Sequence, residues 1–212
     1  MMRKDYKTVK GYGEKEIVIS KSRFIAYVDR AETEEEAIEF INKIKKMHYN
    51  ATHNCSCYMI GEHNQIQKAN DDGEPSGTAG VPMLEVLKKQ GLQDTVVVVT
   101  RYFGGIKLGA GGLVRAYSKA TSEGIAAAQV VERRLHHVMK VTIDYTWLGK
   151  VENEVRNSIY TLADMQYSDH VDLMIHVLKD DERAFTEWMT ELTNGQAKIT
   201  CIDKIFIEKV IS

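Results

Sequence analysis

Two glycine-rich runs decide how this chain folds: Asp71-Asp-Gly-Glu-Pro-Ser-Gly-Thr-Ala-Gly80 and Arg101-Tyr-Phe-Gly-Gly-Ile-Lys-Leu-Gly-Ala-Gly-Gly112. Nine of the fifteen glycines and both prolines lie between Gly73 and Gly112. Glycine is used where the backbone takes a positive φ or lies close against another group, so the clustering indicates a specialised surface. The runs locate the functional surface without identifying its ligand.

Each glycine-rich run is expected to lead into a helix. The first helix is expected to have Pro82 in its first turn and to end at Gly91. A second, alanine-rich helix is expected over about 111–129. Residues 95–103 between them are almost continuously apolar, as in a strand covered on both faces. Upstream, residues 33–36 form a capping box before an amphipathic helix. The first part of the chain is therefore predicted to be an α+β domain.

The pattern changes after about residue 135. Strand, helix, strand, strand, helix and strand follow one another, which is the element order of a ferredoxin-like domain. Glu132-Arg-Arg is the candidate boundary. We therefore expect two domains, 1–132 and 133–212, in an α+β protein.

Composition indicates a soluble cytoplasmic protein. The chain is 43% hydrophobic and 27% charged, and it contains no apolar run long enough for a membrane helix. Three cysteines are too few for a disulfide framework, which fits a reducing compartment. The net charge is −2, and neither half is strongly basic, so any RNA contact has to be a local patch.

The glycine-rich runs supply two candidate anion sites. Helix amino termini present unpaired N–H groups, and glycine lets a phosphate approach them closely. The spacing matches neither the P-loop nor the dinucleotide fingerprint, which argues against ATP and NAD. Glycines that only permit tight turns and close packing are the alternative. The candidate residues are Gly77, Thr78, Gly80, Arg101, Tyr102, Gly104, Gly105, Lys107, Gly109, Gly111, Gly112 and Arg115.

Acidic residues and cysteines raise the question of a metal. Asp71, Asp72 and Glu74 are candidate ligands for a divalent ion, although such a run more commonly forms a turn in which aspartates bond their own backbone. The alternating residues of His53-Asn-Cys55-Ser-Cys57 would share one face of a strand, but the spacing is not that of a structural zinc site. We therefore expect no resident cofactor, with a divalent metal as the alternative.

Aromatic residues stand beside the basic ones. Tyr102, Phe103 and Tyr117 lie near three basic residues in the sequence, Arg101, Lys107 and Arg115. Single-stranded nucleic acid favours this mixture of stacking faces and positive charge. The same aromatic residues are equally suited to core packing.

The two glycine-rich runs, together with Thr52-His-Asn-Cys55 ahead of them, closely resemble the signature of the IMPACT family and its bacterial branch. The resemblance covers essentially the whole chain. It implies an amino-terminal domain similar to domain IV of elongation factor G and a carboxy-terminal ferredoxin-like domain similar to domain V. It further suggests binding to RNA, the ribosome or a translation factor. Eukaryotic relatives act on translation through an additional domain that this chain lacks.

The leading hypothesis is a non-enzymatic, translation-associated regulatory protein in which Arg101, Lys107 and Arg115 contact phosphate or an acidic partner. The first alternative is a metal-dependent enzyme acting on a phosphorylated or nucleotide substrate, with the ion on the three carboxylates and His53 as the base. The second is a pure protein-interaction module whose acidic second domain docks on a basic partner. Sequence does not determine the oligomeric state, or whether the acidic and basic runs share one cleft.

Overall fold

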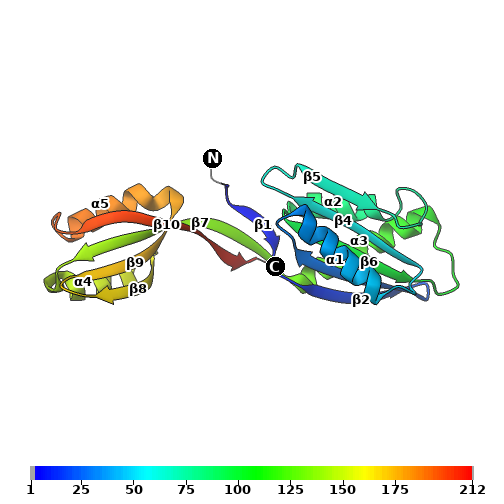
Figure 1. The fold of residues 1–212 in the computed structure, drawn as a ribbon, viewed down its shortest axis with the longest axis horizontal. Coiled ribbons are helices and arrows are strands. Elements are labelled where there is room, and N and C mark those ends of the chain that lie inside the picture. Colours follow the sequence, from blue (N-terminus) through cyan, green and yellow to red (C-terminus); the bar gives the residue numbers. More distant parts are fainter. Residues whose placement is uncertain (1–2, 212) are drawn as a thin grey trace. The chain divides into compact units, whose positions relative to one another are not determined.

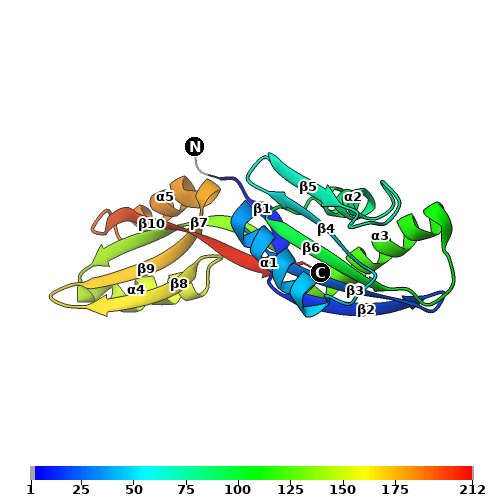
Figure 2. The ribbon, with the colours of Figure 1, turned by 45° about the vertical axis from the view of Figure 1, so that its right-hand side comes forward.

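The computed structural model describes residues 3–211 and divides them into two compact units (Figures 1 and 2). Unit 1 runs to Arg133 and takes in the end of the chain from Glu208. Unit 2 is Arg134–Ile207. Strands β7 (Val130–Ile143) and β10 (Lys198–Val210) therefore contribute residues to both units.

Unit 1 is built on an antiparallel sheet in which the order of the strands differs from their order in the sequence. Each adjacent pair in this sheet is antiparallel. The strands, in spatial order, are β2 (Gly13–Ile19), β3 (Ser22–Arg30), β6 (Thr95–Tyr102), β4 (His53–Ile60) and β5 (Ile66–Asn70). Strand β1 (Tyr6–Val9) pairs instead with the first residues of β7.

Helices cover both faces of this sheet. Helix α1 (Glu34–Met47) packs on one face, and α2 (Gly80–Gln90) and α3 (Gly109–Ala128) pack on the other. Strand β6 lies at the centre, where Val97 and Val99 face α2 and α3 while Val96 and Val98 face α1. The prediction of a strand covered on both faces is confirmed.

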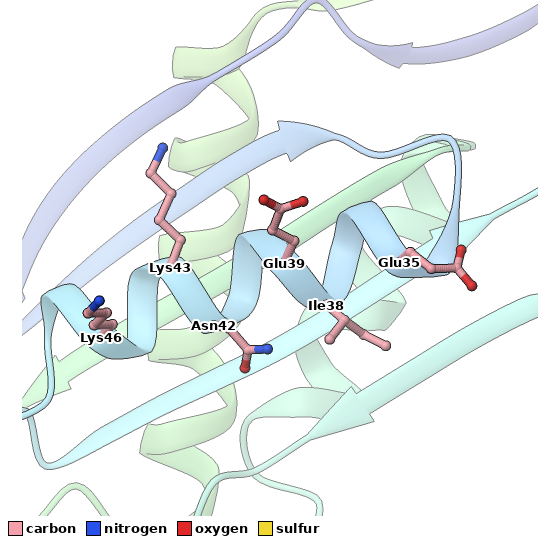
Figure 3. Close-up of a pocket in the computed structure, with 6 residues that line it drawn as sticks. All are labelled: Glu35, Ile38, Glu39, Asn42, Lys43 and Lys46. Atoms are coloured by element: carbon pink, nitrogen blue, oxygen red, sulfur yellow. The ribbon is translucent and has the colours of Figure 1, made fainter.

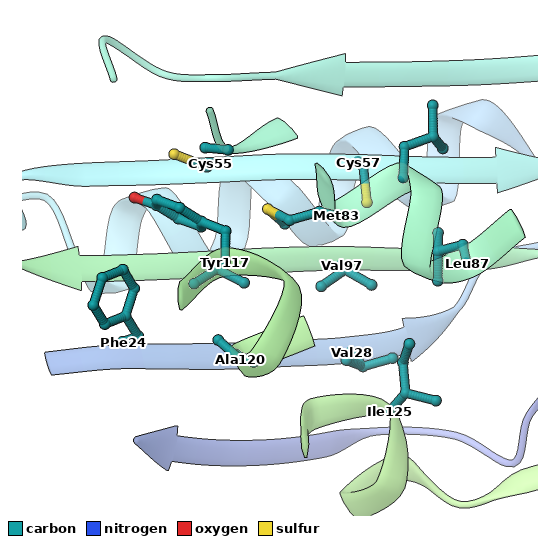
Figure 4. Close-up of a cluster of buried hydrophobic side chains, with 14 of the residues drawn as sticks. Phe24, Val28, Cys55, Cys57, Met83, Leu87, Val97, Tyr117, Ala120 and Ile125 are labelled. Carbon is teal, nitrogen blue, oxygen red and sulfur yellow. The ribbon is translucent and has the colours of Figure 1, made fainter. Parts of the chain in front are cut away.

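The core under α2 and α3 is tightly packed (Figure 4). Phe24 and Tyr117 meet edge to face with ring centroids 5.3 Å apart, and both are fully buried. A Cβ at Gly124 would lie 2.7 Å from the Cβ of Ala26, so glycine is what lets α3 approach the sheet this closely. The long buried face of α3 fixes the direction in which its amino terminus points.

The start of α1 confirms the predicted cap. Thr33 Oγ1 accepts a hydrogen bond from the Glu36 N–H at 3.2 Å, and α1 begins at Glu34. The carboxylate of Glu36 accepts from the backbone N–H of Glu32 rather than from that of Thr33. The capping box therefore predicts the start of the helix correctly. Only the hydrogen bond of the Glu36 side chain differs, because it goes to the N–H group one residue before the cap.

Unit 2 has the predicted order of elements. Strand β7 is followed by α4 (Tyr145–Arg156), β8 (Thr161–Tyr167), β9 (Val171–Leu178), a short 3-10 turn, α5 (Glu182–Leu192) and β10. The spatial order β10, β7, β9, β8 is that of a ferredoxin-like sheet. Buried residues of β7 and β9 alternate, and they pack with α4 and α5 into a core of their own. The α+β class with two domains is confirmed, whereas the likeness of unit 1 to domain IV of elongation factor G stays a prediction.

Candidate functional site

A pocket of about 390 Å³ lies in unit 1 where strand β6 ends and helix α3 begins. Both glycine-rich runs contribute to it, so the acidic and basic runs share one cleft. The lining residues are Thr52, His53, Glu74, Pro75, Arg101, Phe103, Lys107, Leu108, Gly109, Ala110 and Leu113.

Strand alternation decides which residues of the second run reach the pocket. Successive side chains of a strand point to opposite faces. Arg101 therefore continues the α3-facing series of Val97 and Val99, while Tyr102 packs with the cluster under α1. Tyr102 hydroxyl lies 2.8 Å from His48 Nδ1, and the residue does not line the pocket. The assignment of Tyr102 to the same site as Arg101 is therefore wrong, whereas Phe103, 47% exposed, does line the pocket.

Arg101 forms a buried ion pair at the base of the pocket. Its Nη1 donates to Glu74 Oε1 at 2.6 Å, and the two side chains are only 6% and 3% exposed. The hydroxyl of Tyr117 donates to the same oxygen at 2.8 Å, and burial strongly raises the pKa of that tyrosine. Arg101 lines the pocket, but its charge is compensated by Glu74, so it contributes little net positive charge to a ligand there.

His53 stands at the wall of the pocket beside this pair. Its Nδ1 lies 2.9 Å from the backbone oxygen of Asp72, and since a carbonyl only accepts, we assign the ring proton to Nδ1. Its Nε2 lies 3.7 Å from Glu74 Oε2. The distance is too long for a hydrogen bond, so His53 is held by the backbone rather than by Glu74.

The amino terminus of α3 is exposed at the pocket. Leu108 occupies the cap position, and within residues 3–211 no side chain caps this helix. Gly109 takes a φ of +66°, and the following first turn is exposed up to Gly111. The N–H groups of a first helical turn have no partner inside the helix and carry its positive dipole end. Lys107 adds an exposed positive charge immediately before this turn.

Arg115 lies one turn further along α3. It is exposed, and its Nη1 is 3.6 Å from where a Cβ of Gly111 would be, so the guanidinium folds back over the first turn. Lys107 and Arg115 are therefore two exposed cations beside this helix end. Glu74 neutralises Arg101, and the rim of the pocket is left with a positive excess.

The backbone N–H groups at and before the amino terminus of α2 bind a carboxylate of the chain itself. The carboxylate of Asp71 accepts from the backbone N–H groups of Gly77 at 2.8 Å, Ala79 at 3.1 Å and Gly80 at 2.8 Å. Burial acts to raise the pKa of Asp71, but these three donors outweigh it and hold the pKa below its usual value. Thr78 donates its hydroxyl to the Pro75 oxygen at 2.6 Å. The prediction of a free anion site at Gly77, Thr78 and Gly80 is corrected, since a carboxylate of the protein already occupies it.

The three acidic residues of the first run go to different partners. Asp72 accepts from Lys45 Nζ at 2.7 Å and from the Asn54 N–H at 2.7 Å, whereas Asp71 and Glu74 bind the groups described above. Burial works against ionisation of Asp72, but the Lys45 and Asn54 bonds outweigh it and lower its pKa. Among the described residues, no metal-ligand cluster contains any of the three. The geometry therefore uses these carboxylates as structural acceptors.

Two glycines of the second run have a packing role. A Cβ at Gly104 would lie 2.0 Å from the Lys21 backbone oxygen, so only glycine fits against the turn between β2 and β3. Gly105 takes a φ of +87°, which turns the chain towards Lys107. Neither lines the pocket, unlike Gly109. The run therefore combines structural and surface glycines, which composition alone does not separate.

The cysteines of β4 belong to the core. Cys55 and Cys57 are buried in the cluster under α2, and the thiol of Cys55 donates to the backbone carbonyl oxygen of Asp71 at 3.0 Å. Burial raises the pKa of Cys55 to about 12 and raises that of Cys57 as well. A buried thiol with a raised pKa stays protonated at neutral pH and is a poor nucleophile. The interpretation as a buried pair is the one that the structure favours.

A second hollow lies on the outer face of α1 (Figure 3). Glu39 and Lys43 point to one side of the helix and the exposed Ile38 to the other, while Glu35 and Lys46 lie near its two ends. These charges do not converge on a common point, and acidic residues followed by basic ones at helical spacing, such as Glu39 and Lys43, are typical of a solvated surface. This face serves as a reference surface on the other side of the sheet from α3.

A membrane-spanning helix was not expected from the sequence. Within residues 3–211, no helix combines the length and the apolar content needed to cross a membrane.

Comparison with protein families divides the chain as the structure does. The Impact N-terminal domain matches residues 20–125, which include both glycine-rich runs and every residue that lines the pocket. A domain of unknown function, DUF1949, matches residues 141–196 within unit 2.

Whole-length similarity extends to curated relatives and to a solved structure. The chain is 61% identical to "IMPACT family member YvyE" of Bacillus subtilis, over 98% of this chain and 95% of that one. It is 30% identical to "IMPACT family member YigZ" of Escherichia coli, over 88% of this chain and 92% of that one. A crystal structure described as that of a hypothetical protein superposes with a TM-score of 0.60 at 26% identity, covering 96% of this chain and 99% of its own.

Proposed function

The chain belongs to the IMPACT family, and on that premise we propose that it is a translation-associated protein that binds RNA of the ribosome through the pocket at the amino terminus of α3. Membership of this family implies a translation-related regulatory role. The proposal assigns RNA binding to residues 1–132, leaves residues 133–212 as a separate domain, and places the protein in the cytoplasm, where ribosomes act.

One observation carries the proposal. The first turn of α3 is exposed and uncapped by the described side chains, and Lys107 stands beside it. Phosphate is the ligand that such a helix end and a lysine bind best, because the N–H groups donate and both charges are positive. Phe103 supplies an exposed aromatic face at the same pocket, on which an unstacked base can lie.

The neighbouring ion pair has a supporting role. Arg101 and Glu74 are buried together below the pocket and cancel each other's charge. They therefore hold the end of β6 against the first glycine-rich run, rather than attract the ligand. The enzyme alternative gains no support, because Asp71, Asp72 and Glu74 have separate protein partners and do not converge.

Co-sedimentation of the full chain with ribosomes at increasing salt tests the proposal. Each phosphate contact that is lost reduces the slope of log K against log salt by about 0.7 for single-stranded RNA. We expect the double variant Lys107→Ala, Arg115→Ala to bind more weakly with a shallower slope. The matched control is Lys43→Ala, Lys46→Ala, which removes two exposed lysines of α1.

Equal affinity and slope in the two double variants would contradict the proposal. Binding that survives nuclease treatment would also contradict it, since the partner would then be a protein. Both double variants change only exposed side chains, so their folded stability is expected to stay within about 0.5 kcal/mol of the parent chain.

A further inference from the structure

Unit 2 contains a cluster of metal-ligating side chains that the proposed RNA site does not use. His137 of β7, Glu182 at the start of α5 and Cys201 of β10 each place one ligand atom within 4.8 Å of the other two. All three belong to the unit 134–207. The cluster therefore lies within one compact unit, although its members come from three separate elements.

The histidine of this cluster is buried and contacts the glutamate directly. Its Nδ1 lies 2.8 Å from Glu182 Oε2, and its side chain is only 7% exposed. The other ring nitrogen, Nε2, is buried and has no hydrogen-bond partner among the described residues. The two ring nitrogens point in opposite directions, so Nδ1 is the atom that faces Glu182 and the one that His137 offers to the cluster. Nδ1 and the Glu182 carboxylate therefore face one point, and both can ligate a single ion that displaces the proton between them.

From this arrangement we propose that His137, Glu182 and Cys201 bind a zinc ion, with water as the fourth ligand. A thiolate and an imidazole select zinc over magnesium or calcium, which prefer oxygen ligands alone. In a tetrahedral site with bonds of about 2.0–2.3 Å, the ligand atoms stand roughly 3.3–3.8 Å apart. The observed separations, all below 4.8 Å, reach that spacing by small side-chain rotations.

The cysteine of the cluster is accessible to an ion from solvent. Cys201 is exposed and Cys55 and Cys57 are buried, so Cys201 is the one described thiol that a solvent-borne ion reaches directly. Zinc displaces the thiol proton on binding, which makes affinity rise with pH. Strand β7 begins unit 2 and β10 ends it, so the ion would cross-link the two ends of this unit to α5.

Cobalt titration of the chelator-treated, reduced full chain tests the proposal. Cobalt substitutes for zinc, and a thiolate ligand gives an intense charge-transfer band in the near ultraviolet. We expect one cobalt per chain with this band, and displacement of cobalt by one equivalent of zinc. Cys201→Ser should abolish the band, and this exposed substitution leaves the fold intact.

Two further variants sharpen the test. Glu182→Gln should weaken cobalt binding by at least about tenfold, because even the loss of an outer partner of a metal ligand typically costs 10- to 100-fold. His136→Gln is the matched control, since His136 precedes His137 on β7 and bonds the Arg134 oxygen instead. It should bind cobalt as the parent chain does.

A second readout does not depend on cobalt. Alkylation of the native chain, followed by mass spectrometry, should label Cys201 and spare Cys55 and Cys57, and zinc should slow the labelling of Cys201. The proposal would be overturned if the parent chain gave no charge-transfer band, or if the Cys201→Ser variant kept that band. Labelling of Cys201 at the same rate with and without zinc would overturn it too.

Discussion

The two glycine-rich runs of unit 1 look alike in sequence and end differently in the structure. Each leads into a helix, α2 or α3, and each supplies glycines at or near the first turn. At α2 the free N–H groups bind the Asp71 carboxylate, whereas the first turn of α3 is exposed and, among the described residues, has no side-chain cap. Glycine at a helix start therefore indicates an anion site only where the chain does not bring its own anion.

The largest expected effect lies between the two runs, at the ion pair that joins them. Glu74→Ala leaves the guanidinium of Arg101 buried without its counter-charge, which we expect to lower the free energy of unfolding by about 3–5 kcal/mol. Urea denaturation monitored by circular dichroism measures it. The same change at Glu16, whose partner Arg23 is half exposed, should cost at most about 1 kcal/mol. Equal losses in the two variants would show that the pair does not join the runs.

The next effect separates the two helix ends directly. Asp71→Ala removes the acceptor of three backbone N–H groups at α2, and we expect a loss of about 1–2 kcal/mol in unfolding free energy, as for other lost helix caps. Affinity for ribosomes should not change, because α2 does not supply the RNA site. Asp71→Ala binding ribosomes more strongly than the parent chain would show that the two helix ends are equivalent.

The smallest effect is in the pH dependence of stability. The folded pKa of Asp71 lies below its ordinary value of 3.8, so its contribution to stability is complete above that value. The contribution is lost as the pH falls from about 3.8 through the lower folded pKa, because protonation removes the acceptor. Urea denaturation between pH 5 and pH 2 should therefore show a shallower decline for Asp71→Asn than for the parent chain. Parallel curves would contradict the assigned role of Asp71.

Local patterns predicted most of the fold. The capping box at Thr33 predicts the start of α1, and the nearly continuous apolar run predicts β6. The order of strands and helices along the sequence predicts the ferredoxin-like fold of unit 2. These features depend on residues close together in the sequence, where spacing and propensity suffice. Strand β5 was not predicted, because Ile66–Asn70 is polar and largely exposed at the edge of its sheet.

The site was predicted in part, and its errors come from contacts distant in sequence. Whether the two runs share one cleft is left open by the sequence, and the structure places residues of both runs, with His53 and Lys107, around one pocket. The pairing of Arg101 with Glu74 is not among the predictions. A signal was present, since an arginine ending a strand buried on both faces needs a counter-charge. For His137, Glu182 and Cys201 no such signal exists, because only the sheet order of unit 2 brings these residues together.

Amide resonances during an RNA titration test the central claim most directly. With the full chain labelled with nitrogen-15 and a short single-stranded RNA added, the N–H groups at both helix ends are observed in one experiment. We predict saturable shifts at Gly109, Gly111 and Gly112 of α3, and none of comparable size at Gly77 and Gly80, whose N–H groups already bind Asp71. Shifts of equal size at both helix ends, or shifts confined to Gly77 and Gly80, would contradict the account.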